Sequence, residues 1–156
     1  MDEAARVIAR LKEKGLTLAT AESCTGGLLG KRLTDVAGSS AVYLGGVISY
    51  AYAVKEKLLG VDPAVLEETG AVCEEVAIQM AQGVRKHLGA DFALATTGNA
   101  GPSADPKNPN VGEIYVALAC EKTSLCRKLT LHGSREENRT EACRAALKLL
   151  LENIYA

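Results

Sequence analysis

Hydrophobic positions recur along the chain with two different periods, which predicts helices alternating with buried strands. Near the N-terminus, Ala4, Ile8 and Leu11 follow the capping residue Asp2 at helical spacing, and Gly15 is placed to end that helix. Later segments show the same helical spacing or short runs of β-branched and apolar residues between turns. Further helices are expected at about 29–36, 53–59, from 63 onward, 74–88 and 136–153, and strands at 16–21, 42–50, 92–97, 112–120 and 125–132. The buried stripe of the helix at 74–88 is expected to consist of Val76, Met80, Val84 and Leu88.

The order of these elements predicts the fold class. Helices and strands alternate early in the chain, whereas the last two strands lie close enough in sequence to form an antiparallel hairpin. We therefore expect a three-layer α/β/α fold with a mixed, mainly parallel sheet of about five strands. No repeat, low-complexity tract or linker interrupts the pattern, so residues 1–156 are expected to form a single domain.

Charge and composition narrow the class of partner. The chain has 18 Lys and Arg against 19 Asp and Glu, a net charge of -1, and only 4% aromatic residues. It therefore offers neither a basic field nor stacking platforms for nucleic acid. No apolar run reaches the roughly 18 residues of a membrane-spanning helix, and residues 1–14 lack the apolar centre of a signal peptide. We expect a cytoplasmic protein that binds neither nucleic acid nor a membrane.

The cysteine and histidine content argues against metal and disulfide chemistry. Five cysteines are present, an odd number, and none forms a C-x-x-C pair. Only two histidines, His87 and His132, are available to complete a zinc site. We expect reduced cysteines that pack as small apolar side chains, with no metal and no cofactor.

The candidate chemistry begins at a polar, glycine-containing turn after the first expected strand, AESCTGG at 21–27. Such turns often form active sites in α/β proteins, because the N–H groups at the start of the next helix can bind a phosphate or an oxyanion. Ser23 and Thr25 add hydroxyl groups there, although the same side chains could simply cap the helix. Neither the phosphate-binding Walker pattern nor the nucleophile elbow G-x-S-x-G matches this turn.

A nucleophilic serine at this turn would need a base. Lys55 is a candidate because the uncharged segment 50–54 leads into it, and a buried lysine can lose its proton. The alternatives are a solvated surface charge for Lys55, and either His87 or His132 as the base.

Several runs of the sequence, together with Lys55, are typical of one family. They are AESCTGG at 21–27, AGSSAVYLGGVISY at 37–50, GAV at 70–72, GNAGP at 98–102 and VGEIYVAL at 111–118. Over about residues 4–152 the chain closely resembles the C-terminal domain of the competence-damage-inducible protein CinA, a family that includes stand-alone nicotinamide mononucleotide deamidases. The family's separate N-terminal molybdopterin-binding-like domain has no counterpart in this sequence, so we expect the stand-alone form.

The resemblance implies an activity and a set of partners. The activity is amide hydrolysis in pyridine nucleotide salvage, which converts nicotinamide mononucleotide and water to nicotinate mononucleotide and ammonia. The implied partner is therefore a small pyridine nucleotide. No metal or cofactor takes part in such a scheme, and we expect a homo-oligomer.

The resemblance also implies roles for individual residues. Ser23 matches the nucleophile, Lys55 the lysine that activates it, and Tyr50 a neighbouring tyrosine that can relay a proton to ammonia. The amides of Cys24, Thr25 or Gly26 are candidates for stabilising the oxyanion. The resemblance implies that the substrate-binding residues are Cys24, Thr25, Gly26, Gly27, Ser39, Gly98, Asn99, Arg135 and Arg139. The two arginines are expected to face the phosphate or the carboxamide end of the substrate.

The chain departs from the family pattern beside this expected pocket. Asn99 stands where isoleucine or threonine is expected, and SADP at 103–106 replaces a glycine-rich stretch. Cys73 also replaces a helix-capping serine. Two alternatives therefore remain, namely a Ser-Lys amidase for another carboxamide and a nucleotide-binding module without turnover. Ammonia release from a panel of carboxamides distinguishes them.

Overall fold

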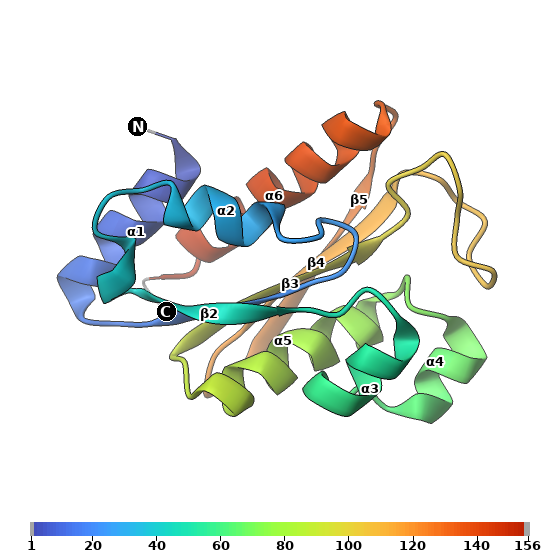
Figure 1. The fold of residues 1–156 in the computed structure, drawn as a ribbon, viewed down its shortest axis with the longest axis horizontal. Coiled ribbons are helices and arrows are strands. Elements are labelled where there is room, and N and C mark those ends of the chain that lie inside the picture. The colour runs from blue at the N-terminus through green and yellow to red at the C-terminus, as the bar shows by residue number, and fades with distance from the viewer. Residues whose placement is uncertain (1, 155–156) are drawn as a thin grey trace.

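The computed structural model, which describes residues 2–154, contains one five-stranded sheet with helices on both faces (Figure 1). All of the expected helices and strands are present, with boundaries shifted by a few residues. In chain order they are α1 Glu3–Lys14, β1 Leu18–Glu22, α2 Leu28–Thr34, the 3₁₀ helix η1 Ser39–Ala41, β2 Tyr43–Ile48, α3 Tyr52–Leu59, α4 Pro63–Thr69, α5 Glu74–Leu88, β3 Phe92–Gly98, β4 Glu113–Ala119, β5 Ser124–Thr130 and α6 Arg135–Leu151.

The strand order is β2-β1-β3-β4-β5, and the sheet is mixed. Strand β1 pairs in parallel with β2 and with β3, whereas β3 with β4 and β4 with β5 pair antiparallel. All strands except β4 therefore point the same way, and β4 and β5 form the expected hairpin. The carboxyl ends of β1, β2 and β3 meet at one edge of the sheet, the edge at which open α/β sheets bind ligands.

The three central strands, β1, β3 and β4, present alanines to one face of the sheet and larger residues to the other. Leu94 and Leu118 pack against α1, α2 and α6, whereas Ala93 and Ala95 pack against α3, α4 and α5. Figure 1 shows these two helical layers on opposite sides of the sheet. The alternation follows from the two-residue period of a strand, and it confirms the expected three-layer arrangement.

Close packing fixes the helix that carries Lys55. At Gly83 of α5, an added Cβ would lie 1.9 Å from the carbonyl oxygen of Leu59, the last residue of α3. No side chain fits between these two backbones, so glycine is required there. Helix α3 thus sits directly on α5, which in turn covers the alanine face of the sheet.

Asp2 and Gly15 mark the ends of α1 as predicted, whereas one residue of the predicted buried stripe of α5 is exposed. Asp2 caps α1 by accepting from Ala5 N at 2.8 Å, and Gly15 ends the helix with a φ of 67°. Leu88, expected to be buried, is 36% exposed because it is the last residue of α5.

Two predictions concern the whole chain. No helix within residues 2–154 is both long and apolar enough to cross a membrane. The predicted single domain of residues 1–156 includes Met1 and residues 155–156, which lie outside the described part of the chain.

Candidate active site

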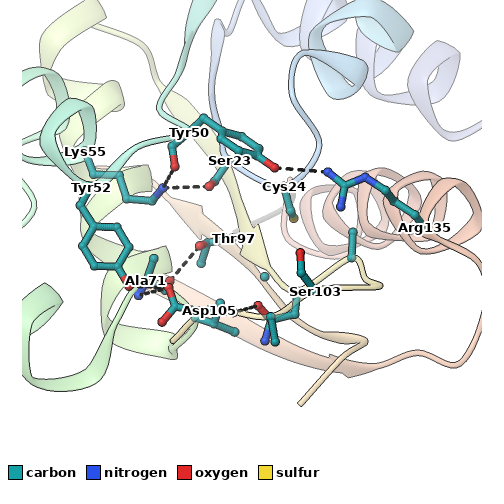
Figure 2. Close-up of a pocket in the computed structure, with 15 residues that line it drawn as sticks. Ser23, Cys24, Tyr50, Tyr52, Lys55, Ala71, Thr97, Ser103, Asp105 and Arg135 are labelled. Atoms are coloured by element: carbon teal, nitrogen blue, oxygen red, sulfur yellow. Dashed lines mark hydrogen bonds between the residues drawn. The ribbon is translucent and has the colours of Figure 1, made fainter. Parts of the chain in front are cut away.

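A cavity of about 200 Å³ opens at the carboxyl ends of β1, β2 and β3. Ser23 reaches it from the turn after β1, Lys55 from α3, and Arg135 from the start of α6 (Figure 2). The loop between β3 and β4 adds Asn99 and Asp105. Residues distant in sequence therefore meet here because the parallel strands bring their following loops to one edge.

Lys55 and Ser23 form the centre of this cavity. The Lys55 side chain is 0% exposed, and its Nζ lies 2.8 Å from Ser23 Oγ. The same Nζ donates to the carbonyl oxygens of Ser49 at 2.5 Å and Tyr50 at 3.2 Å. A neutral amine has two hydrogens and one lone pair. Since the two carbonyls take the hydrogens, the lone pair of a neutral Lys55 faces the Ser23 hydroxyl.

The surroundings of Lys55 favour the neutral form. Burial lowers its pKa from 10.5 to about 8, because the ammonium ion loses its hydration, while Cys24 and Asp105 oppose this shift electrostatically. No residue within 2–154 forms an ion pair with Lys55. This lysine therefore has the properties of a base that can accept the serine proton near neutral pH.

The thiol beside Ser23 is not a competing nucleophile. Burial raises the pKa of Cys24 to about 12, so its sulfur stays protonated, and thiols react as thiolates. All five cysteines are free of disulfides, as the sequence predicts.

A residue that the sequence analysis did not single out organises the turn. The Glu22 carboxylate, 2% exposed, accepts from the Thr25 hydroxyl at 2.6 Å. It also accepts from the backbone N–H groups of Gly27, Leu29 and Gly30 at 3.1, 2.9 and 2.9 Å. The chain's own carboxylate therefore occupies the positive end of α2, where we expected a substrate phosphate or an oxyanion. An acidic residue just before a helix is the sequence signal that could have indicated this.

Hydrogen bonds also decide which amides of the turn stay available. The Gly26 N–H donates to Ser23 O at 3.1 Å, which removes it from the expected oxyanion donors. Of the two other expected donors, Cys24 lines the cavity and remains a candidate, whereas Thr25 is buried outside the lining. Arg139 donates to the carbonyl oxygens of these same two residues, each at 3.0 Å, and so ties the turn to α6 from outside the cavity.

Tyr50 and Arg135 lie together at one side of the cavity (Figure 2). The Tyr50 side chain is 63% exposed, and its hydroxyl accepts from the Arg135 guanidinium at 3.2 Å. Arg135 also donates to Gly101 O at 2.7 Å. The backbone carbonyl of Tyr50, rather than its ring, contacts Lys55.

The long loop between β3 and β4 is ordered by asparagine side chains. Asn99 donates to Asn108 O at 2.9 Å and to Asn110 O at 3.1 Å, and it accepts from Asp105 N at 2.8 Å. Asn108 and Asn110 in turn donate to the Glu113 carboxylate at 2.8 and 3.1 Å. These bonds fold the loop into one wall of the cavity.

The structure brings together only some of the expected site residues. Thr25, Gly26 and Gly27 of the turn and Arg139 of α6 lie outside the cavity lining, while Ser39 lies in η1, before the amino end of β2. His87 and His132, the alternative bases, are exposed and lie elsewhere. The lining includes the expected Ser23, Cys24, Tyr50, Lys55, Gly98, Asn99 and Arg135, together with Tyr52, Thr97 and Asp105, which the sequence analysis missed.

The described residues contain no cluster of side chains that could bind a metal ion. Within residues 2–154, no group of three or more His, Cys, Asp or Glu side chains is arranged to hold an ion. The polar side chains that line the cavity carry hydroxyls, an amine, a guanidinium, an amide, one thiol and one carboxylate.

Fold and site together define an α/β protein with a serine paired to a buried lysine at the sheet's ligand-binding edge. Residues 2–154 match the CinA C-terminal domain, and the chain belongs to that family. It is 50% identical over 144 residues to a CinA-like protein of Geobacter sulfurreducens, and this match covers 92% of the present chain and 35% of the relative. The chain spans about a third of the length of the curated relatives it matches.

Solved structures of the same family have the same fold. The competence/damage inducible protein CihA from Agrobacterium tumefaciens superposes with a TM-score of 0.92 at 38% identity, over 96% of this chain and 92% of that one. A CinA superfamily protein from Escherichia coli superposes with a TM-score of 0.93 at 31% identity, over 96% and 87% of the two chains. These matches confirm the family resemblance and the α/β fold.

Proposed function

We propose that this chain is an amidohydrolase that converts nicotinamide mononucleotide and water to nicotinate mononucleotide and ammonia. The observation that carries the proposal is the 2.8 Å contact between Lys55 Nζ and Ser23 Oγ inside a cavity, with Lys55 fully buried. A binding site has no need of a nucleophile held against a base, so this pair favours turnover over binding alone.

The first half of the reaction forms an ester between Ser23 Oγ and the carbonyl carbon of the ring's carboxamide group. Neutral Lys55 takes the hydroxyl proton while Ser23 Oγ attacks the carboxamide carbon, and the amide of Cys24 stabilises the resulting oxyanion. The tetrahedral intermediate then expels the amine, which takes the proton from the Lys55 ammonium and leaves as ammonia. Tyr50 is proposed as a relay for that proton.

The second half restores the enzyme. Water enters where ammonia left, and neutral Lys55 accepts one of its protons as the oxygen attacks the ester carbon. Collapse of this intermediate breaks the bond to Ser23 Oγ, which regains a proton from Lys55. The product is the pyridine carboxylic acid, which releases a proton to solvent and becomes the carboxylate, and one water has been consumed for each ammonia released.

The shape of the site supports a nucleotide that bears a carboxamide ring. A cavity of about 200 Å³ can hold the ring, while the ribose phosphate extends toward Arg135, whose guanidinium can bind a phosphate. We place the phosphate there because Glu22 already fills the N-terminus of α2. The cytoplasmic location and the homo-oligomer remain predictions from the sequence.

The test is ammonia release by the Ser23→Ala variant. We expect turnover of nicotinamide mononucleotide to fall below detection, while substrate binding and the melting temperature are retained. Ser124→Ala is the matched control, because its hydroxyl lies on β5 and bonds to Gln82 far from the cavity. A Ser23→Ala enzyme with near-normal turnover would disprove the nucleophile. Wild-type binding of the nucleotide without ammonia release would instead favour the binding module, and release from other carboxamides alone would favour a different amidase.

A further inference from the structure

The loop between β3 and β4 brings a negative charge into the cavity. The Asp105 carboxylate accepts hydrogen bonds from the Tyr52 hydroxyl, from Ala71 N at 3.4 Å and from Lys107 N at 2.9 Å. All of these donors are uncharged. No residue within 2–154 forms an ion pair with Asp105, and the Lys107 ammonium donates to Glu67 O instead.

The reacting state leaves this charge without a nearby cation. Asp105 and Ser23 lie on opposite sides of the cavity, with Thr97 between them in Figure 2. The carboxylate acts electrostatically on Lys55, but Lys55 must be neutral to accept the serine proton. Arg135 is held at the side of the cavity by Tyr50 and Gly101. When Lys55 is neutral, Asp105 and Arg135 are the charged side chains of the lining, and Asp105 forms no ion pair with Arg135 or with Lys55.

We propose that Asp105 makes this cavity selective for carboxamides on a cationic ring. The inference rests on the proposed function for its substrate class, since the ring of nicotinamide mononucleotide is a pyridinium. The ring nitrogen is two bonds from the carbon that bears the carboxamide. A carboxamide seated at Ser23 thus brings the positive charge into the inner cavity, where Asp105 stabilises it.

The loop is built to hold the carboxylate in this place. Asn99, one of the departures from the family pattern, accepts a hydrogen bond from the backbone N–H of Asp105. The Tyr52 hydroxyl keeps its proton and so continues to donate to Asp105, because burial and the Asp105 carboxylate raise the pKa of Tyr52 to about 12. Asp105 is therefore a specificity residue in a rigid wall rather than a mobile surface charge.

The experiment compares two small amides that differ by a methyl group and a charge, the cation 1-methylnicotinamide and neutral nicotinamide. The measured quantity is the ratio of kcat/KM for the cation to kcat/KM for the neutral amide. For Asp105→Asn, which keeps the shape, we expect this ratio to fall about tenfold or more. Asp105→Glu, which keeps the charge, is expected to restore a ratio closer to that of the wild type.

Asp62→Asn is the matched control for the loss of a negative charge. Asp62 caps α4 by accepting from Ala64 N at 2.9 Å and lies outside the cavity, and asparagine caps helices equally well. We expect its ratio to equal that of the wild type. A second readout is the pH–rate profile, in which Asp105→Asn should move the Lys55 limb to lower pH because the charge that raises the pKa of Lys55 is gone.

Two results would overturn the proposal. One is a folded Asp105→Asn variant, judged by circular dichroism, that loses both activities by the same factor. The other is an equal change of the ratio in Asp62→Asn. If the wild type hydrolyses neither amide nor the mononucleotide, the proposed function fails, and calorimetry with the same two amides then decides the role of Asp105. Tighter binding of the cation by the wild type but not by Asp105→Asn supports it, and equal binding refutes it.

Discussion

Replacing Lys55 by arginine tests whether Lys55 acts as a base or only supplies a positive charge. Both side chains can donate to the carbonyl oxygens of Ser49 and Tyr50 and to Ser23 Oγ, the three partners of Nζ. A guanidinium, however, keeps its proton at every accessible pH. If Lys55 acts as the base, Lys55→Arg must be nearly inactive even where it folds, and if it only supplies charge, activity must survive.

The size of the loss follows from the lowered pKa of Lys55. With a pKa of about 8, about one tenth of the lysine is neutral at pH 7, against about one part in three thousand at the ordinary value. For arginine the neutral fraction is about one part in a million or less. We therefore expect turnover of Lys55→Arg at pH 7 to fall by about 10⁴-fold or more.

The assay is ammonia release from nicotinamide mononucleotide between pH 5.5 and 9.5. For the wild type, the rate should rise about tenfold per pH unit below the pKa of Lys55 and level off above about 8. Lys55→Met, measured beside it, removes the base without adding a charge and should also be inactive. An arginine variant within about threefold of the wild type, or a profile without this limb, would refute the reasoning.

Further predictions concern stability and metal dependence. Because folding lowers the pKa of Lys55 from 10.5 to about 8, its ammonium destabilises the fold below about pH 8, and this penalty disappears as the pH rises from 8 to 10.5. In urea unfolding, the free energy of unfolding of the wild type, relative to that of Lys55→Met, should therefore increase by about 3 kcal/mol across that window. Glu22→Gln should cost about 2 kcal/mol or more in the same assay, since it removes a buried carboxylate from the first N–H groups of α2, whereas an unchanged stability would contradict this capping role. Gly83→Ala should lower the melting temperature by the equivalent of about 1–3 kcal/mol, although alanine favours helices, because its Cβ meets the Leu59 carbonyl. Ammonia release should be unchanged after treatment with a chelator, and a loss restored by zinc would contradict the Ser-Lys scheme.

The sequence by itself determined the secondary structure and the layers. Periodicity, caps and turn residues act within a few positions, so Asp2, Gly15 and the short run at 92–97 indicate their elements directly. The motif-based resemblance likewise identified the family and singled out Ser23 and Lys55 before their contact was known. Even the error at Leu88 is local, because the helical period is right and only the end of the helix leaves the core.

Only the tertiary structure decided which of these residues share a cavity. Ser39 belongs to a family motif, yet it precedes β2 and so lies away from the carboxyl ends that form the site. The reverse holds for Asp105, which the folding of a long loop carries into the cavity. Arg139 of α6 likewise supports the turn through contacts with Cys24 and Thr25, which lie far from it in the sequence. The physical reason is that a cavity depends on which loops the strand order brings together. The burial that lowers the pKa of Lys55 exists only once those loops have met.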